Sequence, residues 1–267
     1  MTRGSPVRLI LTFSLPLLVG NIFQQLYNMV DTMIVGRFVS TQALAGVGST
    51  GAISFLIMGF AMGVTSGFSV VISQRFGAND EKGLRSAVAM SVYLCVALTV
   101  VMTLVSTLAT RPLLMLMNTP DDMFADAYQY IFTIFAGMAA PIFYNMLAGI
   151  LRALGDSRTP LYFLILSSVL NVGLDLLFIL SFHMGVIGAA VATIISQVVS
   201  GLLCLLYMVK RFPILRFRKG DWRIDGSLIG LHLRIGLPMA FQFSITAIGV
   251  MAVQGAINAF GSGAAAG

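Results

Sequence analysis

The sequence has very little charge. Only 10% of its 267 residues are Asp, Glu, Lys or Arg, whereas 58% are hydrophobic and the mean hydropathy is +0.93. Soluble domains carry roughly 25% charged residues, so this chain cannot cover a water-facing surface and its solvent is expected to be lipid. The net charge of +6 does not indicate a nucleic-acid partner, because the basic residues occupy short loops between apolar runs.

Cysteine and histidine are also scarce. Cys95 and Cys204 both lie inside apolar runs, which is typical of small buried residues and disfavours a disulfide or metal site. The two histidines, His183 and His232, fall at the ends of apolar runs, where we expect contact with water at the membrane surface. No HExxH pattern and no cluster of acidic residues in a polar loop accompanies them. We therefore expect neither enzyme activity nor a cofactor.

Long apolar runs dominate the sequence. A spanning helix needs about 20 mostly apolar residues, and seven stretches qualify: 12–37, 43–73, 86–110, 123–150, 160–182, 185–208 and 228–260. No small-residue cleavage site follows the first stretch, which is therefore interpreted as an uncleaved spanning helix rather than a signal peptide. The predicted fold class is an all-α integral membrane protein.

The basic residues alternate with the predicted spans. All of the 16 Lys and Arg residues except Arg37 and Arg111 fall at the N-terminus, in the loops after spans two, four and six, or at the start of span seven. Positively charged loops are retained in the cytoplasm. The pattern predicts a multi-pass protein of a cytoplasmic (inner) membrane, with its N-terminus in the cytoplasm.

The seventh span resembles the first. Ser14-Leu15-Pro16 opens span one and Gly236-Leu237-Pro238 opens span seven. The same offset aligns Met29 with Met251, Phe38 with Phe260, and Gly46 approximately with Gly267. Transporters are often built from internal repeats, so we expect a second six-helix repeat to begin near residue 228.

This repeat predicts the domain organisation. Residues 1–209 would form a six-helix N-terminal lobe, 210–227 a cytoplasmic inter-lobe loop, and 228–267 the truncated start of a C-terminal lobe. We accordingly expect the chain to be a fragment of a protein roughly twice as long, or a natural half that associates with a second copy.

Two ionisable residues fall well inside the spans, where such residues are costly and usually functional. A helical rise of 1.5 Å per residue places Asp31, Tyr130, Asp175 and Thr193 about 9–12 Å below the outer membrane face. Asn171 lies one turn below Asp175 on the same helix face. The sequence therefore predicts a polar layer in the outer half of the membrane.

Such a layer has a definite chemistry. Two buried carboxylates that lie close together resist double ionisation, so the pair could take up and release a proton, or bind a small hard cation through oxygen ligands. Plainer alternatives exist: Asp31 could reach the surface from a nearby helix end, Thr193 could bond its own helix backbone, and Tyr130 could be an interfacial anchor.

Glycine and proline predict packing and bending. Gly59, Gly63 and Gly67 are spaced by four in span two, a pattern that lets two helices approach closely. Pro16 and Pro141 predict kinks in spans one and four. A transporter that rocks between two states needs such joints, although a proline kink is also common in rigid membrane helices.

Five segments, in order, make the chain similar to a known family. They are LPLLVGNIFQQLYNMVDTMIVG at 15–36, GFAMGVTSGFSVVISQRFGAND at 59–80, RALGDSRTP at 152–160, NVGLD at 171–175 and GVIGAAVATIISQ at 185–197. Together they resemble the multidrug and toxic compound extrusion (MATE) family, especially its bacterial and archaeal members related to the DNA-damage-inducible branch.

The resemblance implies twelve helices in two six-helix lobes around a central cavity. It also implies export of cationic or amphipathic drugs and toxins, driven by inward flow of H⁺ or Na⁺. The matching coupling positions are Asp31, Asn171, Asp175 and Thr193, with no metal expected beyond Na⁺ at these four, and the chamber-lining or substrate-binding positions are Tyr130, Gln24 and Asn145. The expected partners are a small organic substrate and membrane lipid, and the missing C-terminal lobe or a second copy is needed to complete the cavity.

Two other functions fit part of the pattern. A lipid-linked saccharide flippase of the same superfamily would share the fold, but its large anionic substrate would need several Lys or Arg residues in the cavity, and none falls at mid-span. A passive channel would need no opposing gradient. The substrate and the choice between H⁺ and Na⁺ stay open.

Overall fold

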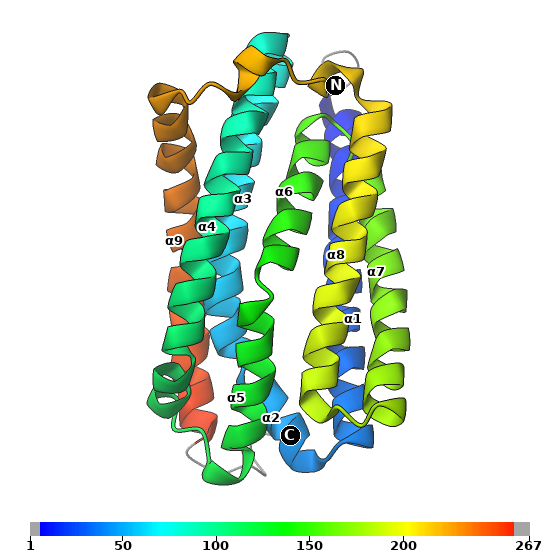
Figure 1. Ribbon diagram of the computed structural model, residues 1–267, viewed down its shortest axis with the longest axis vertical. Helices are drawn as coiled ribbons and strands as arrows, with labels where there is room; N and C mark the ends of the chain where they lie inside the picture. Colours follow the sequence, from blue (N-terminus) through cyan, green and yellow to red (C-terminus); the bar gives the residue numbers. More distant parts are fainter. Residues whose placement is uncertain (1–5, 259–267) are drawn as a thin grey trace.

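The computed structural model describes residues 6–258, and every regular element within them is a helix (Figure 1). The elements are α1 (Pro6–Phe38), α2 (Thr41–Ser49), α3 (Gly51–Gly77), α4 (Glu81–Leu116), α5 (Asp121–Ala136), α6 (Ala139–Ala153), α7 (Arg158–Leu176), the π-helical η1 (Leu177–Ser181), α8 (Gly185–Arg211), the 3₁₀ turns η2 (Pro213–Leu215) and η3 (Lys219–Trp222), and α9 (Gly226–Asn258). The predicted all-α fold is confirmed.

The seven predicted apolar stretches correspond to α1, α2–α3, α4, α5–α6, α7–η1, α8 and α9. Among the described residues, five continuous segments are long and apolar enough to cross a membrane, and the bent pair α5–α6 makes a sixth if it is one span. The predicted first span is not among these segments. It is α1, a helix of 33 residues whose C-terminal half carries a polar face.

Two of the predicted spans are broken rather than straight. Span four bends by 50° between α5 and α6, because Pro141 has no N–H and its ring excludes a helical carbonyl four residues earlier, at Gly137. The bend predicted from Pro141 is therefore present, one turn before the proline itself. Span two is interrupted at Thr50, whose hydroxyl donates to the carbonyl of Val47 at 2.7 Å.

The ends of the helices sort as the basic loops predict. In Figure 1 the start of α1, the α3–α4 and α6–α7 connections and the segment between α8 and α9 lie at one end of the bundle, and the α1–α2, α4–α5 and η1–α8 connections at the other. The alternation of predicted loops is thus matched. The assignment of the first end to the cytoplasm stays a prediction.

The tightest helix contact is between α3 and α9. A Cβ atom added to Gly63 would lie 2.5 Å from the Cα of Ala240, and one added to Gly67 would collide with the Cα of Gly236. These glycines therefore bring the two backbones almost into contact, as expected of small residues spaced by four. The close approach predicted from the spacing is confirmed, and its partner is the helix that begins the predicted second lobe.

One expectation about histidine is wrong. His232 does not contact water but is completely buried between α9, α3 and α4. Its Nδ1 lies 2.7 Å from the carbonyl of Leu228, its Nε2 lies 3.1 Å from the Ser91 hydroxyl, and its ring meets the edge of Phe68. The cause is the close α3–α9 packing, which covers this turn of α9. His183, in contrast, is exposed at a helix end with φ 53°.

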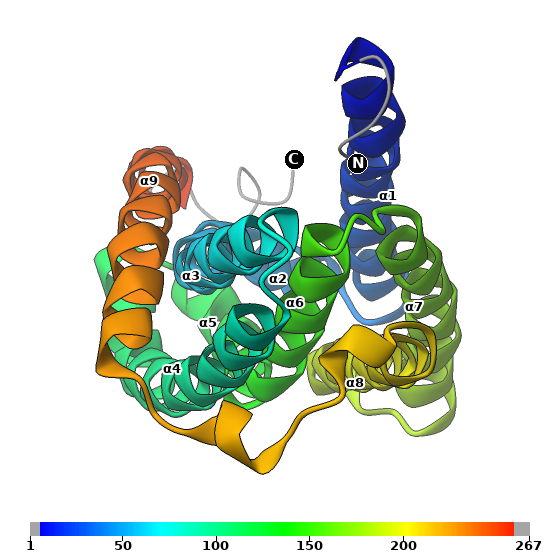
Figure 2. The same ribbon diagram turned by 90° about the horizontal axis from the view of Figure 1, so that it is seen from above.

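Some sequence predictions fall outside the described residues. Arg3 precedes them, and the repeat partners Phe260 and Gly267 follow them. Within them, α8 continues to Arg211 and α9 begins at Gly226, so the connection between the two predicted lobes comprises 212–225. Seen from above, this connection passes around the outside of the bundle, beyond α4, on its way from α8 to α9 (Figure 2).

Candidate functional site

A cavity of about 640 Å³, lined by both polar and apolar side chains, opens among α1, α3, α5, α6 and α8, with smaller contributions from α2 and α9. Its most polar wall is α1, which contributes Asn21, Gln24, Gln25, Asn28 and Asp31. These positions recur at intervals of three and four residues and therefore share one face of the helix. Most other residues of α1 are apolar, so the amide and carboxyl groups of this helix are concentrated on the face toward the cavity.

The described residues that line the cavity include no basic side chain. They supply carboxylate, amide, hydroxyl and phenol groups, but no Lys, Arg or His. All three ion pairs formed by the described residues lie elsewhere, at the N-terminal end of α4. Negative charge in this cavity is therefore not compensated by these residues.

Asp31 lines this cavity, and Asp175 lies next to it behind the lining. Asp31 is only 6% exposed and Asp175 is completely buried, and the two carboxyl groups are neighbours. The Tyr130 hydroxyl donates to Oδ2 of Asp31 at 3.4 Å, while Oδ1 of Asp31 is buried without a hydrogen-bond partner among the described residues. A proton or a cation would satisfy both the unpartnered oxygen and the uncompensated charge.

A chain of hydrogen bonds surrounds the second carboxylate. The Tyr27 hydroxyl donates to Oγ1 of Thr193 at 3.1 Å. In the amide orientation that satisfies both of its polar atoms, Asn171 accepts from Oγ1 of Thr193 at 3.3 Å and donates to Oδ2 of Asp175 at 2.9 Å. Side-chain hydrogen bonds thus connect α1, α7 and α8 at one level, and Asp175 is part of this network.

The groups in this cluster suit a proton or a small hard cation. Carboxylate, hydroxyl and amide oxygens are the ligands that Na⁺-like cations accept, whereas zinc and similar metals need nitrogen or sulfur donors. The described residues include no group of three His, Cys, Asp or Glu side chains that could hold a metal ion.

The structure brings the predicted coupling residues together. Asp31, Asn171, Asp175 and Thr193 form one cluster with Tyr130, and Gln24 and Asn145 line the same cavity. Asn145 also has a local task, because its amide donates to the carbonyl of Pro141 at 2.8 Å, next to the bend between α5 and α6. The roles of all seven in binding an ion or a substrate remain predictions.

Two residues of the site escaped the sequence reasoning. Tyr27 bonds to Thr193, and Gln197 lines the cavity with its Oε1 buried and unpartnered among the described residues. Both lie four residues from a predicted site residue, Tyr27 before Asp31 and Gln197 after Thr193. A search one helical turn away from each candidate would have found them.

Known proteins share this architecture. The MatE family model matches residues 16–177. The probable multidrug resistance protein YpnP of Bacillus subtilis (strain 168) is 32% identical over 264 residues, which cover 97% of this chain and 58% of YpnP. The chain therefore spans little more than half the length of the curated relatives it matches.

Solved structures match equally well. An inward-facing structure of a multidrug resistance MATE family transporter of the MOP superfamily is 31% identical, has a TM-score of 0.83, and aligns over 91% of this chain and 56% of its own. An outward-facing structure of such a transporter is also 31% identical, with a TM-score of 0.84 over 92% of this chain and 55% of its own. The family match, the similar relatives and the shared helical architecture agree, and the chain belongs to the MatE family.

Proposed function

We propose that this chain supplies the ion-coupling lobe of an antiporter that exports small organic molecules, often cationic, in exchange for H⁺ or Na⁺. One observation carries the proposal: Asp31, which lines the cavity, has the buried Asp175 as its neighbour, and the described lining of the cavity includes no basic residue. Two carboxylates in that position need a cation from outside the protein. The names of the relatives, which are multidrug resistance proteins, support the export of drugs.

The coupling step follows from electrostatics. Without a bound cation, two ionised carboxylates repel each other and favour a hydrated cavity. Binding of H⁺ or Na⁺ between Asp31 and Asp175 removes this repulsion, so that α1 can move toward α7 and α8. Because α1 carries most of the polar cavity wall, this movement narrows the cavity and displaces the substrate, and release of the cation on the other side resets it.

The cavity wall favours one class of substrate. It combines amides and phenols with apolar side chains, among them Phe55, Met58, Met62 and Phe243. Aromatic rings and carboxylates attract organic cations, and methionine adapts to ligands of different shape. A flippase for an anionic lipid-linked saccharide would need positive charge at the same place, so the flippase remains the weaker candidate.

The exporting unit is larger than the described residues. The chain matches little more than half of its relatives, and large apolar side chains such as Leu15 and Leu18 on α1 and Ile245 and Ile248 on α9 are exposed. We propose that a second lobe, or a second copy of this chain, packs against these two helices and closes the cavity. We further propose a cytoplasmic-membrane location with the N-terminus in the cytoplasm, on the strength of the basic loops.

The test is ethidium efflux from vesicles that contain the complete exporting unit. The H⁺ gradient and the Na⁺ gradient are imposed separately. Wild type is expected to export under only one of them, which identifies the coupling ion, and the export rate of Asp175→Asn is expected to be at least tenfold lower. Asp122→Asn, an exposed acid at the start of α5, is the matched control and should retain full activity. Efflux that persists unchanged in Asp175→Asn would refute the coupling role, and efflux independent of both gradients would favour a passive channel.

A further inference from the structure

The last two residues of α8 and the connection to α9 form an unusually basic segment. We call this segment, residues 210–225, the strap. It contains six Lys and Arg residues, Lys210, Arg211, Arg216, Arg218, Lys219 and Arg223, and only two acids, Asp221 and Asp225. The six basic side chains are exposed, and none forms an ion pair within the part of the chain that the structure describes.

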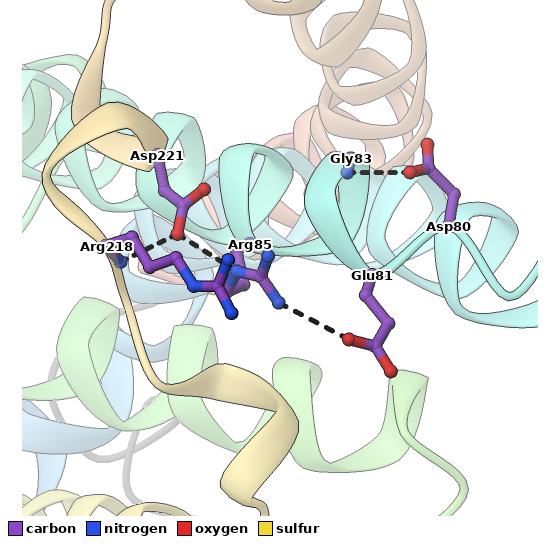
Figure 3. Close-up of polar contacts among 6 residues, drawn as sticks. All are labelled: Asp80, Glu81, Gly83, Arg85, Arg218 and Asp221. Carbon is purple, nitrogen blue, oxygen red and sulfur yellow. Dashed lines mark hydrogen bonds and ion pairs between the residues drawn. The ribbon is translucent and has the colours of Figure 1, made fainter.

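One of the two acids of the strap, Asp221, is turned toward the protein. Asp221 is 4% exposed, and its Oδ2 accepts hydrogen bonds from Nε of Arg85 at 2.9 Å and from the amide of Arg218 at 2.8 Å (Figure 3). Asp225 is exposed and caps α9, where its Oδ1 accepts from the amides of Ser227 and Leu228. Asp221 is therefore withdrawn from the outer surface of the strap, and the six basic side chains there outnumber the one exposed acid.

Charge-assisted hydrogen bonds keep Asp221 ionised. Burial alone would raise its pKa, but the hydrogen bonds from Arg218 and Arg85, together with their positive charges, outweigh burial, so the pKa lies below its ordinary value. Glu81 lies 3.6 Å from the same Arg85, and the neighbouring Asp80 accepts from the amide of Gly83 at the start of α4 (Figure 3). The ion pair between Asp221 and Arg85 thus holds the strap on α4.

Aromatic side chains fix the strap at a definite place. The ring of Trp222 packs 5.7 Å from Tyr93 of α4 and 5.0 Å from Phe217 of the strap, and the Tyr93 hydroxyl donates to the carbonyl of Trp222 at 3.3 Å. Trp222 and Phe217 nevertheless stay exposed over about a third of their surface, and Ile224 over more than two thirds. Trp and Tyr in such mixed surroundings are typical of the boundary between lipid and water.

The position of the strap decides which anion it meets. It passes around the outside of the bundle, next to α4, and not over its centre (Figure 2), and none of its residues lines the cavity. The molecules at the perimeter of a membrane protein, at the ends of its helices, are lipid headgroups. Clusters of four to eight Lys and Arg residues directly beyond a membrane helix attract anionic lipids.

We propose that the strap is a docking surface for anionic phospholipid headgroups. Arg216, Arg218, Lys219 and Arg223 hold the phosphates, and Trp222 and Ile224 enter the boundary layer of the same lipids. The Arg85–Asp221 pair contributes by removing the acid from the outer surface and by holding the strap in place. This site is separate from the cavity and does not depend on which substrate or ion is transported.

Trp222 provides a direct test, since it is the single tryptophan of the 267 residues. The protein is reconstituted into vesicles of phosphatidylcholine and phosphatidylglycerol at low salt, after replacement by phenylalanine of any tryptophan outside these residues. One of the two lipids carries bromine on its acyl chains close to the headgroup. Brominated phosphatidylglycerol is expected to quench Trp222 about two- to threefold more strongly than brominated phosphatidylcholine at equal mole fraction, and the ratio should approach one at high salt.

The variant R216Q/R218Q/K219Q/R223Q should give a ratio near one even at low salt, with an unchanged elution volume as evidence of folding. The control K82Q/R158Q removes two exposed charges at the same end of the bundle but outside the strap, and it should keep the wild-type ratio. Equal quenching by both lipids in wild type, absence of quenching by either, or an equal loss in the control would each overturn the proposal. Quenching of Trp222 does not depend on transport, so this experiment tests the lipid-binding proposal independently of the export function.

Discussion

Two buried carboxyl groups at different places in this molecule invite comparison. Asp221 on the strap and Asp175 next to the cavity are both almost completely withdrawn from solvent. Asp221 has the guanidinium of Arg85 at 2.9 Å, whereas Asp175 has Asn171 and a second acid, Asp31, as its neighbours. A buried carboxylate with a built-in cation serves to hold two segments together, and one without it is available for a cation that comes and goes.

The comparison predicts opposite consequences for the removal of a partner. Arg85→Ala removes the guanidinium that meets the buried charge of Asp221 and leaves it only the amide and the charge of Arg218. It should cost about 3 kcal/mol of stability, the lower end of the usual penalty for breaking a buried pair from one side. Thermal or denaturant unfolding in detergent micelles measures this loss. Lys82→Ala, an exposed residue in the same turn of α4, is the control and should change stability by less than about 0.5 kcal/mol.

A double substitution sharpens this prediction. In R85L/D221N neither charge remains, so most of the stability lost in Arg85→Ala should return. A double variant as unstable as the single one would mean that packing of the Arg85 side chain, and not its charge, holds the strap on α4.

Acid should weaken the attachment of the strap in a predictable direction. The pKa of Asp221 is lower in the folded protein than in the unfolded chain, where an aspartate has a pKa of about 3.9. Its contribution to stability is therefore complete above about pH 4 and is lost as the pH falls through the folded-state value. Arg85 and Arg218 are the basic residues next to it.

The measurement is the difference in unfolding free energy between wild type and Asp221→Asn as a function of pH. This difference should be constant between pH 7 and 5 and should shrink below about pH 4. It should also be smaller than the effect of Arg85→Ala, because the neutral amide that replaces the carboxylate leaves no buried acid without a cation, and Arg85 keeps Glu81 as a partner. A difference that grows on acidification would contradict the lowered pKa.

The sequence shows the two regions to very different extents. The cavity cluster could be predicted because a membrane helix has a fixed rise, so the distance of Asp31 or Asp175 from its helix end determines its depth. Polar residues that lie at the same depth on four helices of one bundle are expected to contact one another. The structure indeed joins Asp31, Tyr130, Asn171, Asp175 and Thr193.

The strap could not be predicted in the same way. Arg85 and Asp221 are 136 positions apart, and no periodicity indicates which loop folds back over which helix. The same limit explains the wrong expectation for His232, whose burial depends on how closely α9 approaches α3. It explains why the break at Thr50 was missed as well. Lateral neighbours are set by packing between distant segments, and depth is set by the helix itself.

The smallest predicted effect on stability is the most informative about the cavity. Asp175→Asn keeps the size of the side chain and a hydrogen-bonding partner for Asn171, and it removes a carboxyl group that has no basic partner among the described residues. Its free energy of unfolding should therefore stay within about 1 kcal/mol of wild type, although cation-driven export is lost. If Asp175→Asn destabilised the protein as much as Arg85→Ala does, Asp175 would be a structural residue like Asp221, and the coupling proposal would lose its basis. If stability is preserved while coupling is lost, the two buried acids differ as their partners indicate: one holds the strap on α4, and the other is available to bind an ion.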